Sequence, residues 1–132
     1  MNNNNKDKCL FCCVANDNKK KIIIDGKFSF AIYDDFPVSD YHCLVIPKRH
    51  VESFFDLLDE ELLEINTLLK QCKIKILAQD STVRGFNVGI NIGEAAGQSV
   101  FHVHVHLIPR RIGDVKSPKG GVRGVIPNKQ NY

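Results

Sequence analysis

Apolar and polar residues alternate along three stretches of the chain, residues 28–33, 86–92 and 100–108. This period of two is typical of β-strands. Residues 42–46 form a short apolar run that a proline then ends, which predicts a further strand. Residues 93–97 contain two glycines and join the last two alternating stretches, so we expect those stretches to pair as a hairpin.

One long helix is predicted to begin at Asp59, a residue type that suits the N-cap position. Apolar residues then recur every three or four positions, which places them on one helix face: Leu62, Ile65, Leu69, Cys72 and Ile76. Beyond Pro109 glycine and proline are frequent, so we expect an irregular C-terminal tail from about residue 111.

Size and composition favour one domain over residues 9–132, because 132 residues with 43% hydrophobic and 25% charged content can bury a core. Residues 1–8 are polar and rich in asparagine, and we expect them to be disordered. No apolar run approaches the roughly 20 residues of a membrane span, and the polar start does not look like a signal peptide. The sequence therefore predicts a cytoplasmic protein with no membrane partner.

The formal net charge of +3 is spread over short basic clusters at residues 19–21 and 110–111. Duplex nucleic acid usually demands a more concentrated basic face, so we expect no nucleic-acid partner. A mild excess of positive charge is compatible with a small anionic ligand. The lysine run itself is most simply a solvated surface.

Five cysteines, an odd and unevenly spaced set, form a poor disulfide framework for a reducing compartment. Cys9 and Cys12 have the spacing of two thiolates on one tetrahedral zinc ion, although two ligands make only half a site. Reduced, metal-free thiols are the alternative. Cys43 and Cys72 lie within apolar patterns and are expected in the core, and Cys13 is a competing ligand or an exposed thiol.

Three of the five histidines, His102, His104 and His106, occupy alternate positions. On a strand their rings would share one face. As core residues they would need three separate polar partners. One metal ion can bind two histidines at alternate positions but not all three, because the outer Cα atoms would lie ~13 Å apart. The third interpretation makes the central imidazole a nucleophile held in the required tautomer.

The segment just upstream of the histidines offers hydrogen-bond donors for a phosphate. Gly97 allows close approach of the backbone, and the Gln98 amide and the Ser99 hydroxyl can bind phosphate oxygens or a leaving group. Taken alone, this tripeptide is a weak signal and is more simply an ordinary turn.

Together these motifs resemble the histidine triad (HIT) family, whose signature is His-x-His-x-His followed by two apolar residues. The resemblance extends through Asn91 and residues 93–99 to residues 42–50, and covers roughly residues 9–110. It implies an α+β fold in which an antiparallel sheet of about five strands packs against one long and one shorter helix. It also implies a homodimer that forms a continuous sheet.

By the same resemblance His104 attacks the α-phosphorus of a purine nucleotide, either a nucleoside 5′-phosphoramidate or a dinucleoside polyphosphate. The product would be a covalent nucleotidyl-histidine that water or another acceptor resolves. The resemblance assigns orientation and polarisation of His104 to other histidines, His102, His106 and His42. A histidine at position 106, where the sugar-phosphate nucleotidylyltransferases carry glutamine, favours the hydrolase branches.

The resemblance also assigns binding roles. Gly97, Gln98 and Ser99 would hold the phosphate and leaving group, Asn91 would support the phosphate end, and Asp34 would bind the ribose hydroxyls. The residues placed against the base would be Leu10 and Phe11. Phe11 is equally compatible with a core position, and Asp34 with an ordinary turn.

In some HIT proteins the Cys-x-x-Cys pair is completed by two histidines, and the matching positions here are His50 and His102. The implied zinc is structural, with Cys9 and Cys12 as the other two ligands. Two alternatives to an enzyme remain open at this stage: a non-catalytic adaptor module that binds purine nucleotides, and a protein whose main property is zinc binding.

Overall fold

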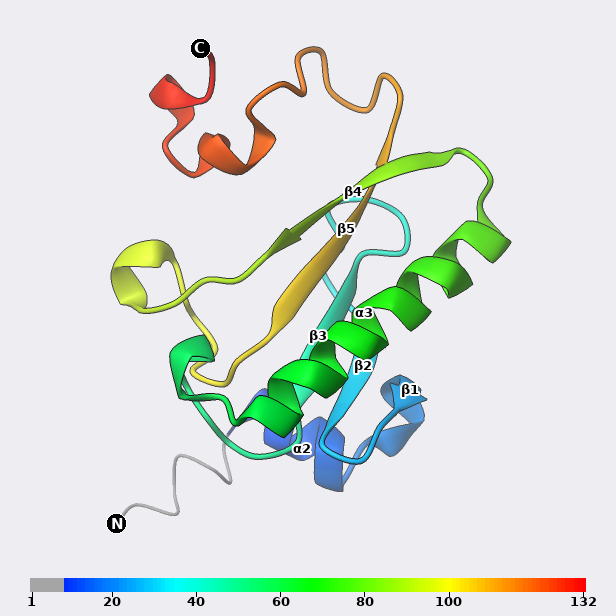
Figure 1. The fold of residues 1–132 in the computed structure, drawn as a ribbon, viewed down its shortest axis with the longest axis vertical. Coiled ribbons are helices and arrows are strands. Elements are labelled where there is room, and N and C mark those ends of the chain that lie inside the picture. Colours follow the sequence, from blue (N-terminus) through cyan, green and yellow to red (C-terminus); the bar gives the residue numbers. More distant parts are fainter. Residues whose placement is uncertain (1–8) are drawn as a thin grey trace.

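The computed structural model describes residues 9–132, so the disorder expected for residues 1–8 lies outside the described residues. Within these residues, five antiparallel strands form one sheet in the order β1-β2-β3-β5-β4, with two α-helices packed on it (Figure 1). The strands are β1 (Ile22–Asp25), β2 (Ser29–Tyr33), β3 (Cys43–Pro47), β4 (Val83–Gly89) and β5 (Val105–Arg111). The predicted α+β fold is confirmed.

The two helices cover opposite faces of the sheet. α3 (Asp59–Gln79) packs on one face and shares a core with Ala31, Val45 and Val105, while α2 (Leu10–Asn16) packs on the other with Phe30, Ile32 and Leu44. Because both faces of β2 and β3 are covered, these strands are buried almost throughout rather than half-buried.

The long helix begins at the predicted place, but its cap and its buried face differ from the prediction. Leu58 is the N-cap and Asp59 is the first helical residue. Leu62 is 43% exposed, and Leu68 is buried where Leu69 was expected. The Glu61 carboxylate explains part of the difference, because it turns inward to accept hydrogen bonds from Arg49 and from the backbone N–H of Leu58.

The hairpin of β4 and β5 is confirmed, but both strand ranges are shifted from the prediction. β4 covers Val83–Gly89 instead of residues 86–92, and β5 begins at Val105 instead of residue 100. His102 and His104 therefore precede the strand, and His102 lies in a bend. That backbone is anchored elsewhere, because the N–H of Val103 donates to the carbonyl of Val51 at 2.8 Å.

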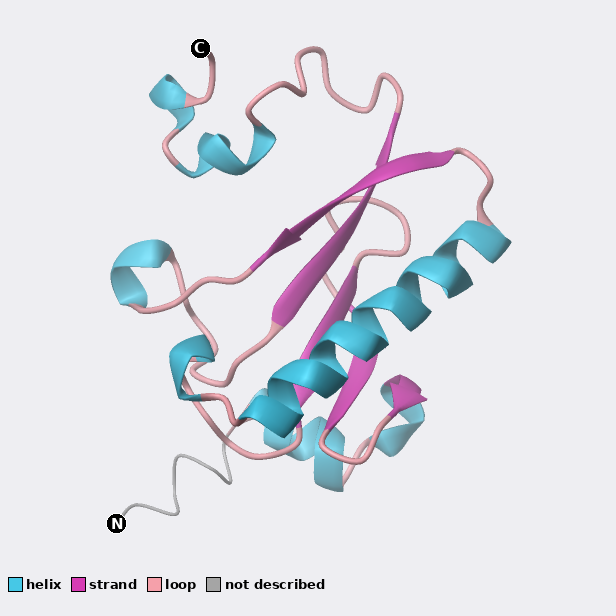
Figure 2. Ribbon diagram, in the orientation of Figure 1, coloured by secondary structure: helices cyan, strands magenta, loops and turns pink. Residues whose placement is uncertain are grey.

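The C-terminal tail is less irregular than expected, since it contains two short 3₁₀ helices, Gly121–Val125 and Pro127–Lys129. Figure 2 shows them beyond the end of the sheet that is remote from α2. A proline at the first position of the second helix fits that helix, since its missing N–H needs no partner there. Among the residues described, no helix has the length and apolar character needed to cross a membrane.

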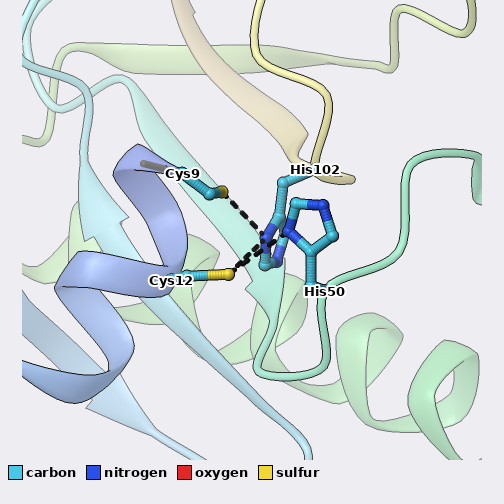
Figure 3. A group of neighbouring side chains, drawn as sticks. All are labelled: Cys9, Cys12, His50 and His102. Carbon is cyan, nitrogen blue, oxygen red and sulfur yellow. Dashed lines mark hydrogen bonds between the residues drawn. The ribbon is translucent and has the colours of Figure 1, made fainter. Parts of the chain in front are cut away.

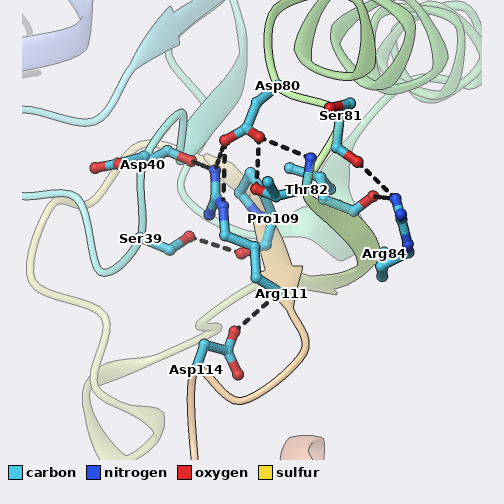
Figure 4. A network of polar contacts seen from close by, with 10 residues as sticks. Ser39, Asp40, Asp80, Ser81, Thr82, Arg84, Pro109, Arg111 and Asp114 are labelled. Atoms are coloured by element: carbon cyan, nitrogen blue, oxygen red, sulfur yellow. Dashed lines mark hydrogen bonds and ion pairs between the residues drawn. The ribbon is translucent and has the colours of Figure 1, made fainter.

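A polar network fixes the end of β5 from which the tail departs (Figure 4). Arg111 donates to the Asp80 carboxylate at 2.8 Å and to the carbonyl of Asp40, while its backbone N–H donates to Asp114. Hydrogen bonds from Thr82 and then from Arg111 lower the pKa of Asp80 to about 2. The network ties β5 to the turn between α3 and β4.

Candidate active site and metal centre

A cavity of about 320 Å³ lies between α2 and the sheet. Its floor crosses successive strands, because Ile32 belongs to β2, Leu44 to β3 and His106 to β5. Seven residues predicted as site residues line it together: Leu10, Phe11, Asp34, Asn91, Ser99, His104 and His106. The sheet register explains part of this, since Leu44 pairs directly with His106.

The His104 ring is held in one tautomer at the cavity wall. Its Nδ1 lies 2.9 Å from the backbone carbonyl oxygen of His102, and a carbonyl can only accept. Nδ1 therefore carries the proton, and Nε2 keeps its lone pair. The ring is 9% exposed and contacts Phe11 and His106, with centroid distances of 5.0 and 5.2 Å.

A chain of hydrogen bonds that starts at the backbone determines which nitrogen of His106 carries the proton. The Val38 N–H donates to His42 Nδ1 at 3.2 Å, so the proton of neutral His42 sits on Nε2. His42 Nε2 lies 2.9 Å from His106 Nδ1 and donates to it. The remaining proton of His106 is then on Nε2, a buried atom with no hydrogen-bond partner among residues 9–132.

Burial, followed by repulsion from the neighbouring histidines, lowers the pKa of His106 to about 4. Burial also lowers the pKa of His42, although nearby Asp34 opposes the shift. Both rings are therefore neutral at pH 7, which is the state the hydrogen-bond chain requires.

Asp34, His42 and His106 place one potential ligand atom each within 4.8 Å of one another, but they suit a hydrogen-bond chain better than a metal ion. A metal on His42 Nε2 would require the proton to move to Nδ1, where it would face the Val38 N–H. Asp34 also accepts from the backbone N–H of Phe36 at 2.8 Å, which fixes its carboxylate at the cavity mouth.

Four predicted residues, His42, His102, Gly97 and Gln98, are not part of the cavity wall as described. The Gln98 amide accepts from the Gly93 N–H at 2.8 Å and donates to the Glu52 carbonyl at 2.8 Å. Gly97 has a φ of 89°, a conformation that favours glycine. Both residues shape the loop that presents Ser99, whereas the phosphate contact predicted for Gln98 would have to compete with these hydrogen bonds.

The four predicted zinc ligands lie together at the first turn of α2 (Figure 3). His102 Nδ1 is 3.4 Å from Cys9 Sγ and 3.5 Å from Cys12 Sγ, and His50 Nδ1 is 3.3 Å from Cys12 Sγ. Helix α2 presents the two sulfurs on one side because they are three residues apart.

The hydrogen bonding of His102 suits a metal ligand. Its Nε2 donates to the Pro47 carbonyl at 2.7 Å, so Nδ1 keeps its lone pair and faces both sulfurs. Burial lowers the pKa of His102 to about 4, which keeps the ring neutral. Two thiolates and two imidazoles form a donor set that zinc prefers in tetrahedral sites.

Sequence reasoning missed seven residues of the cavity wall: Val14, Lys21, Ile32, Asp35, Phe36, Leu44 and Val100. Lys21 belongs to the lysine run that suggested a solvated surface. Its approach to Asp35, at 2.9 Å, depends on the pairing of Ile22 with Ile32, which no local pattern encodes.

Comparison with known proteins agrees with the fold. The family model described as "HIT domain" matches residues 15–113. A HIT-like protein of Mycoplasma pneumoniae is 40% identical over 83% of this chain and 74% of its own length. The adenosine 5′-monophosphoramidase of Saccharomyces cerevisiae is 36% identical over 78% of this chain and 63% of its own length.

A solved structure described as a zinc-bound histidine triad family protein, from Mycobacterium smegmatis, superimposes with a TM-score of 0.72. It is 30% identical, and the match covers 85% of this chain and 81% of the other. The fold and the triad thus define a protein of the histidine triad class. The chain belongs to the HIT family.

Proposed function

We propose that this protein is a nucleotide hydrolase or nucleotidyl transferase that works through a covalent nucleotidyl-histidine on His104. The observation that carries the proposal is the 2.9 Å hydrogen bond from His104 Nδ1 to the His102 carbonyl. That bond leaves the Nε2 lone pair available beside the cavity. The name of the yeast relative, a monophosphoramidase, supports the same class of reaction.

The first step forms a bond between His104 Nε2 and the α-phosphorus and breaks the bond from that phosphorus to the leaving group. The His106 Nε2–H donates a hydrogen bond to the leaving nitrogen or oxygen, which is a role for an otherwise unpartnered N–H, and the leaving group takes its proton from solvent. The His102 carbonyl stabilises the positive charge that develops on the His104 ring. Water or another acceptor then attacks the phosphorus, breaks the bond from phosphorus to His104 Nε2 and loses its proton to solvent, which frees His104.

The remaining cavity residues bind the nucleotide. Ser99 and Asn91 hold the phosphate, Asp34 accepts from the ribose hydroxyls, and Leu10 and Phe11 contact the base. His42 positions His106, and Gly97 and Gln98 maintain the phosphate-binding loop, with Gln98 able to reach phosphate once its loop contacts exchange. The substrates are nucleoside 5′-phosphoramidates or dinucleoside polyphosphates of purines.

Structural zinc at Cys9, Cys12, His50 and His102 completes the proposal. Bound there, the ion would tie α2 to the segment that carries His104, since His102 precedes His104 by two residues. We also propose that the protein acts as a cytoplasmic homodimer, in line with its family resemblance.

Covalent labelling tests the mechanism. Full-length protein is mixed with a nucleoside phosphoramidate that carries radiolabel on the α-phosphorus, and the reaction is quenched in acid or in base. We expect label on the protein that survives base and is lost in acid, because a phosphorus–imidazole bond is acid-labile. His104→Ala should lose both label and turnover.

Two results would count against the proposal: a His104→Ala protein that folds normally and retains substantial turnover, or binding of nucleotide by the wild type without any label. The second result would favour a non-catalytic adaptor module that grips nucleotides with the same residues.

A further inference from the structure

Lys21 and Asp35 form an ion pair on the wall of the cavity that holds His104. Lys21 Nζ lies 2.9 Å from an Asp35 carboxylate oxygen. Lys21 ends the 3₁₀ helix Lys19–Lys21 just before β1, and Asp35 follows β2 by two residues. The side chains are 38% and 59% exposed, so both can turn toward a ligand.

The pair lies at the opposite side of the cavity from the proposed attacking nitrogen. His106 lies on β5, Leu44 on β3 and Ile32 on β2, and Lys21 immediately precedes the paired edge strand β1. Three strand spacings correspond to ~14 Å. That distance is of the order of an extended nucleoside monophosphate.

A nucleotide in this cavity therefore has its base beside the ion pair. With the phosphorus at His104 and the ribose at Asp34, the base extends over Ile32 between apolar walls that include Val14 and Phe11. These side chains contact the faces of the base. The only charged side chains of the described wall besides Asp34 and the histidines are those of Lys21 and Asp35, and they can reach its edge.

The chemistry of the two side chains selects between purines. An ionised carboxylate only accepts hydrogen bonds, and guanine offers two adjacent donors, N1–H and the N2 amino group, beside the acceptor O6. Adenine presents an unprotonated N1 instead, which would face the carboxylate lone pairs. A carboxylate that accepts two parallel N–H bonds is a strong and specific arrangement.

We propose that Asp35 and Lys21 read the base edge and give the site a preference for guanine nucleotides, Asp35 accepting from N1–H and N2–H and Lys21 donating to O6. This inference rests on the proposed function for the placement of the phosphate and the ribose. It adds a choice of base that the triad itself does not make.

Binding of products tests the inference without requiring turnover. GMP, IMP and AMP are titrated into the full-length protein in a calorimeter. We expect GMP to bind at least roughly fivefold more tightly than AMP. The factor is modest because the Lys21 and Asp35 side chains are partly exposed to solvent. IMP, which keeps N1–H and O6 but lacks the N2 amino group, should fall between them.

Asp35→Asn should bring the affinities for GMP and AMP within about twofold, because an amide can both donate and accept. Lys21→Met should weaken GMP binding more than AMP binding. The matched control is Asp25→Asn, which removes a carboxylate of similar exposure, 63%, from another lysine pair outside the cavity. The control should keep the wild-type preference.

Equal affinities in the wild type, or a preference that survives in Asp35→Asn, would overturn the inference. The proposed function is tested separately, by covalent labelling and turnover. Covalent labelling without a guanine preference removes only the base assignment, whereas a guanine preference without labelling or turnover removes the catalytic proposal and leaves the base assignment in place.

Discussion

His42 Nε2 lies 2.9 Å from His106 Nδ1, although the two residues are 64 positions apart in the chain. The contact joins the residue just before β3 to the paired strand β5. Since the backbone N–H of Val38 fixes the tautomer of His42, the main chain ultimately decides which nitrogen of His106 carries the proton.

Loss of the hydrogen bonds that link Val38, His42 and His106 should impair the departure of the leaving group. In His42→Leu, His106 Nδ1 has no donor, and its proton is no longer confined to Nε2. We expect kcat to fall roughly tenfold to a hundredfold with an amine leaving group, and less with a p-nitrophenol leaving group, which departs as a stable anion and needs little help from a hydrogen bond. Steady-state kinetics with both substrates checks this. Equal losses for the two leaving groups would argue for a purely structural role.

Acid should destabilise the fold through the buried histidines. Burial and neighbouring histidines lower the folded-state pKa of His106 to about 4, below its unfolded value of 6.5. Between these values the unfolded chain binds protons that the folded protein does not, so stability is complete above pH 6.5 and falls as pH drops toward 4. From pH 7.5 to 5.5 we expect His106 alone to remove about 1.3 kcal/mol from the free energy of unfolding.

Urea unfolding at these two pH values, with chelator present, measures the effect. Between pH 7.5 and 5.5, the free energy of unfolding of His106→Asn should fall by about 1.3 kcal/mol less than that of the wild type. Identical losses in the two proteins would show that His106 titrates normally in the folded state.

The cysteine and histidine cluster should hold one zinc ion per chain. Cys12→Ser removes the sulfur that lies near both histidine nitrogens, so we expect zinc content to fall well below one equivalent and thermal stability to drop. Elemental analysis of protein purified without chelators gives the stoichiometry. Cys13→Ser changes the adjacent thiol outside the cluster and should retain zinc. A metal content near zero in the wild type would contradict the proposed zinc site.

Local sequence patterns predicted where the central strands β2 and β3 lie, although both of their faces are buried. The apolar run at residues 42–46 became β3, and the alternation at residues 28–33 became β2. Periodicity did not locate the start of β5. The alternating pattern continues through residues 100–102, but these residues form a bend, and the N–H of Val103 bonds to the Val51 carbonyl instead of to a neighbouring strand.

The site was predictable to the extent that its chemistry lies within short motifs. The histidine spacing made His104 a candidate nucleophile, and the Cys-x-x-Cys pair supplied half of a metal site. The family resemblance added His50 and His102, and the structure brings the four cysteine and histidine side chains together. The backbone partners could not be predicted. The carbonyls of His102 and Pro47 and the N–H of Val38 set the tautomers of three rings, and their positions depend on tertiary packing.

Glu64 is expected to stabilise the turn between β1 and β2 from a distance of about 35 positions in the chain. Its carboxylate accepts from the backbone N–H groups of Lys27, Phe28 and Ser29 at 3.1, 2.9 and 2.7 Å, and from the Ser29 hydroxyl at 2.6 Å. Burial raises the pKa of Glu64, but these hydrogen bonds outweigh burial and lower the pKa overall. The turn therefore depends on an ionised carboxylate supplied by α3.

Glu64→Ala leaves three backbone donors and a hydroxyl without this acceptor, and we expect a loss of roughly 2–4 kcal/mol in the free energy of unfolding. Glu64→Gln should lose less, because only one oxygen is replaced by an amino group that opposes the Lys27 N–H. Urea unfolding at pH 7 compares both variants with the exposed control Glu60→Ala.

The contribution of Glu64 to the free energy of unfolding should depend on pH. Because the folded-state pKa of Glu64 is depressed, this contribution is present above the unfolded pKa of 4.5 and disappears as pH falls below it. The gap between wild type and Glu64→Gln should therefore narrow in acid, and a gap that stays constant down to pH 3 would show that charge is not what holds the turn.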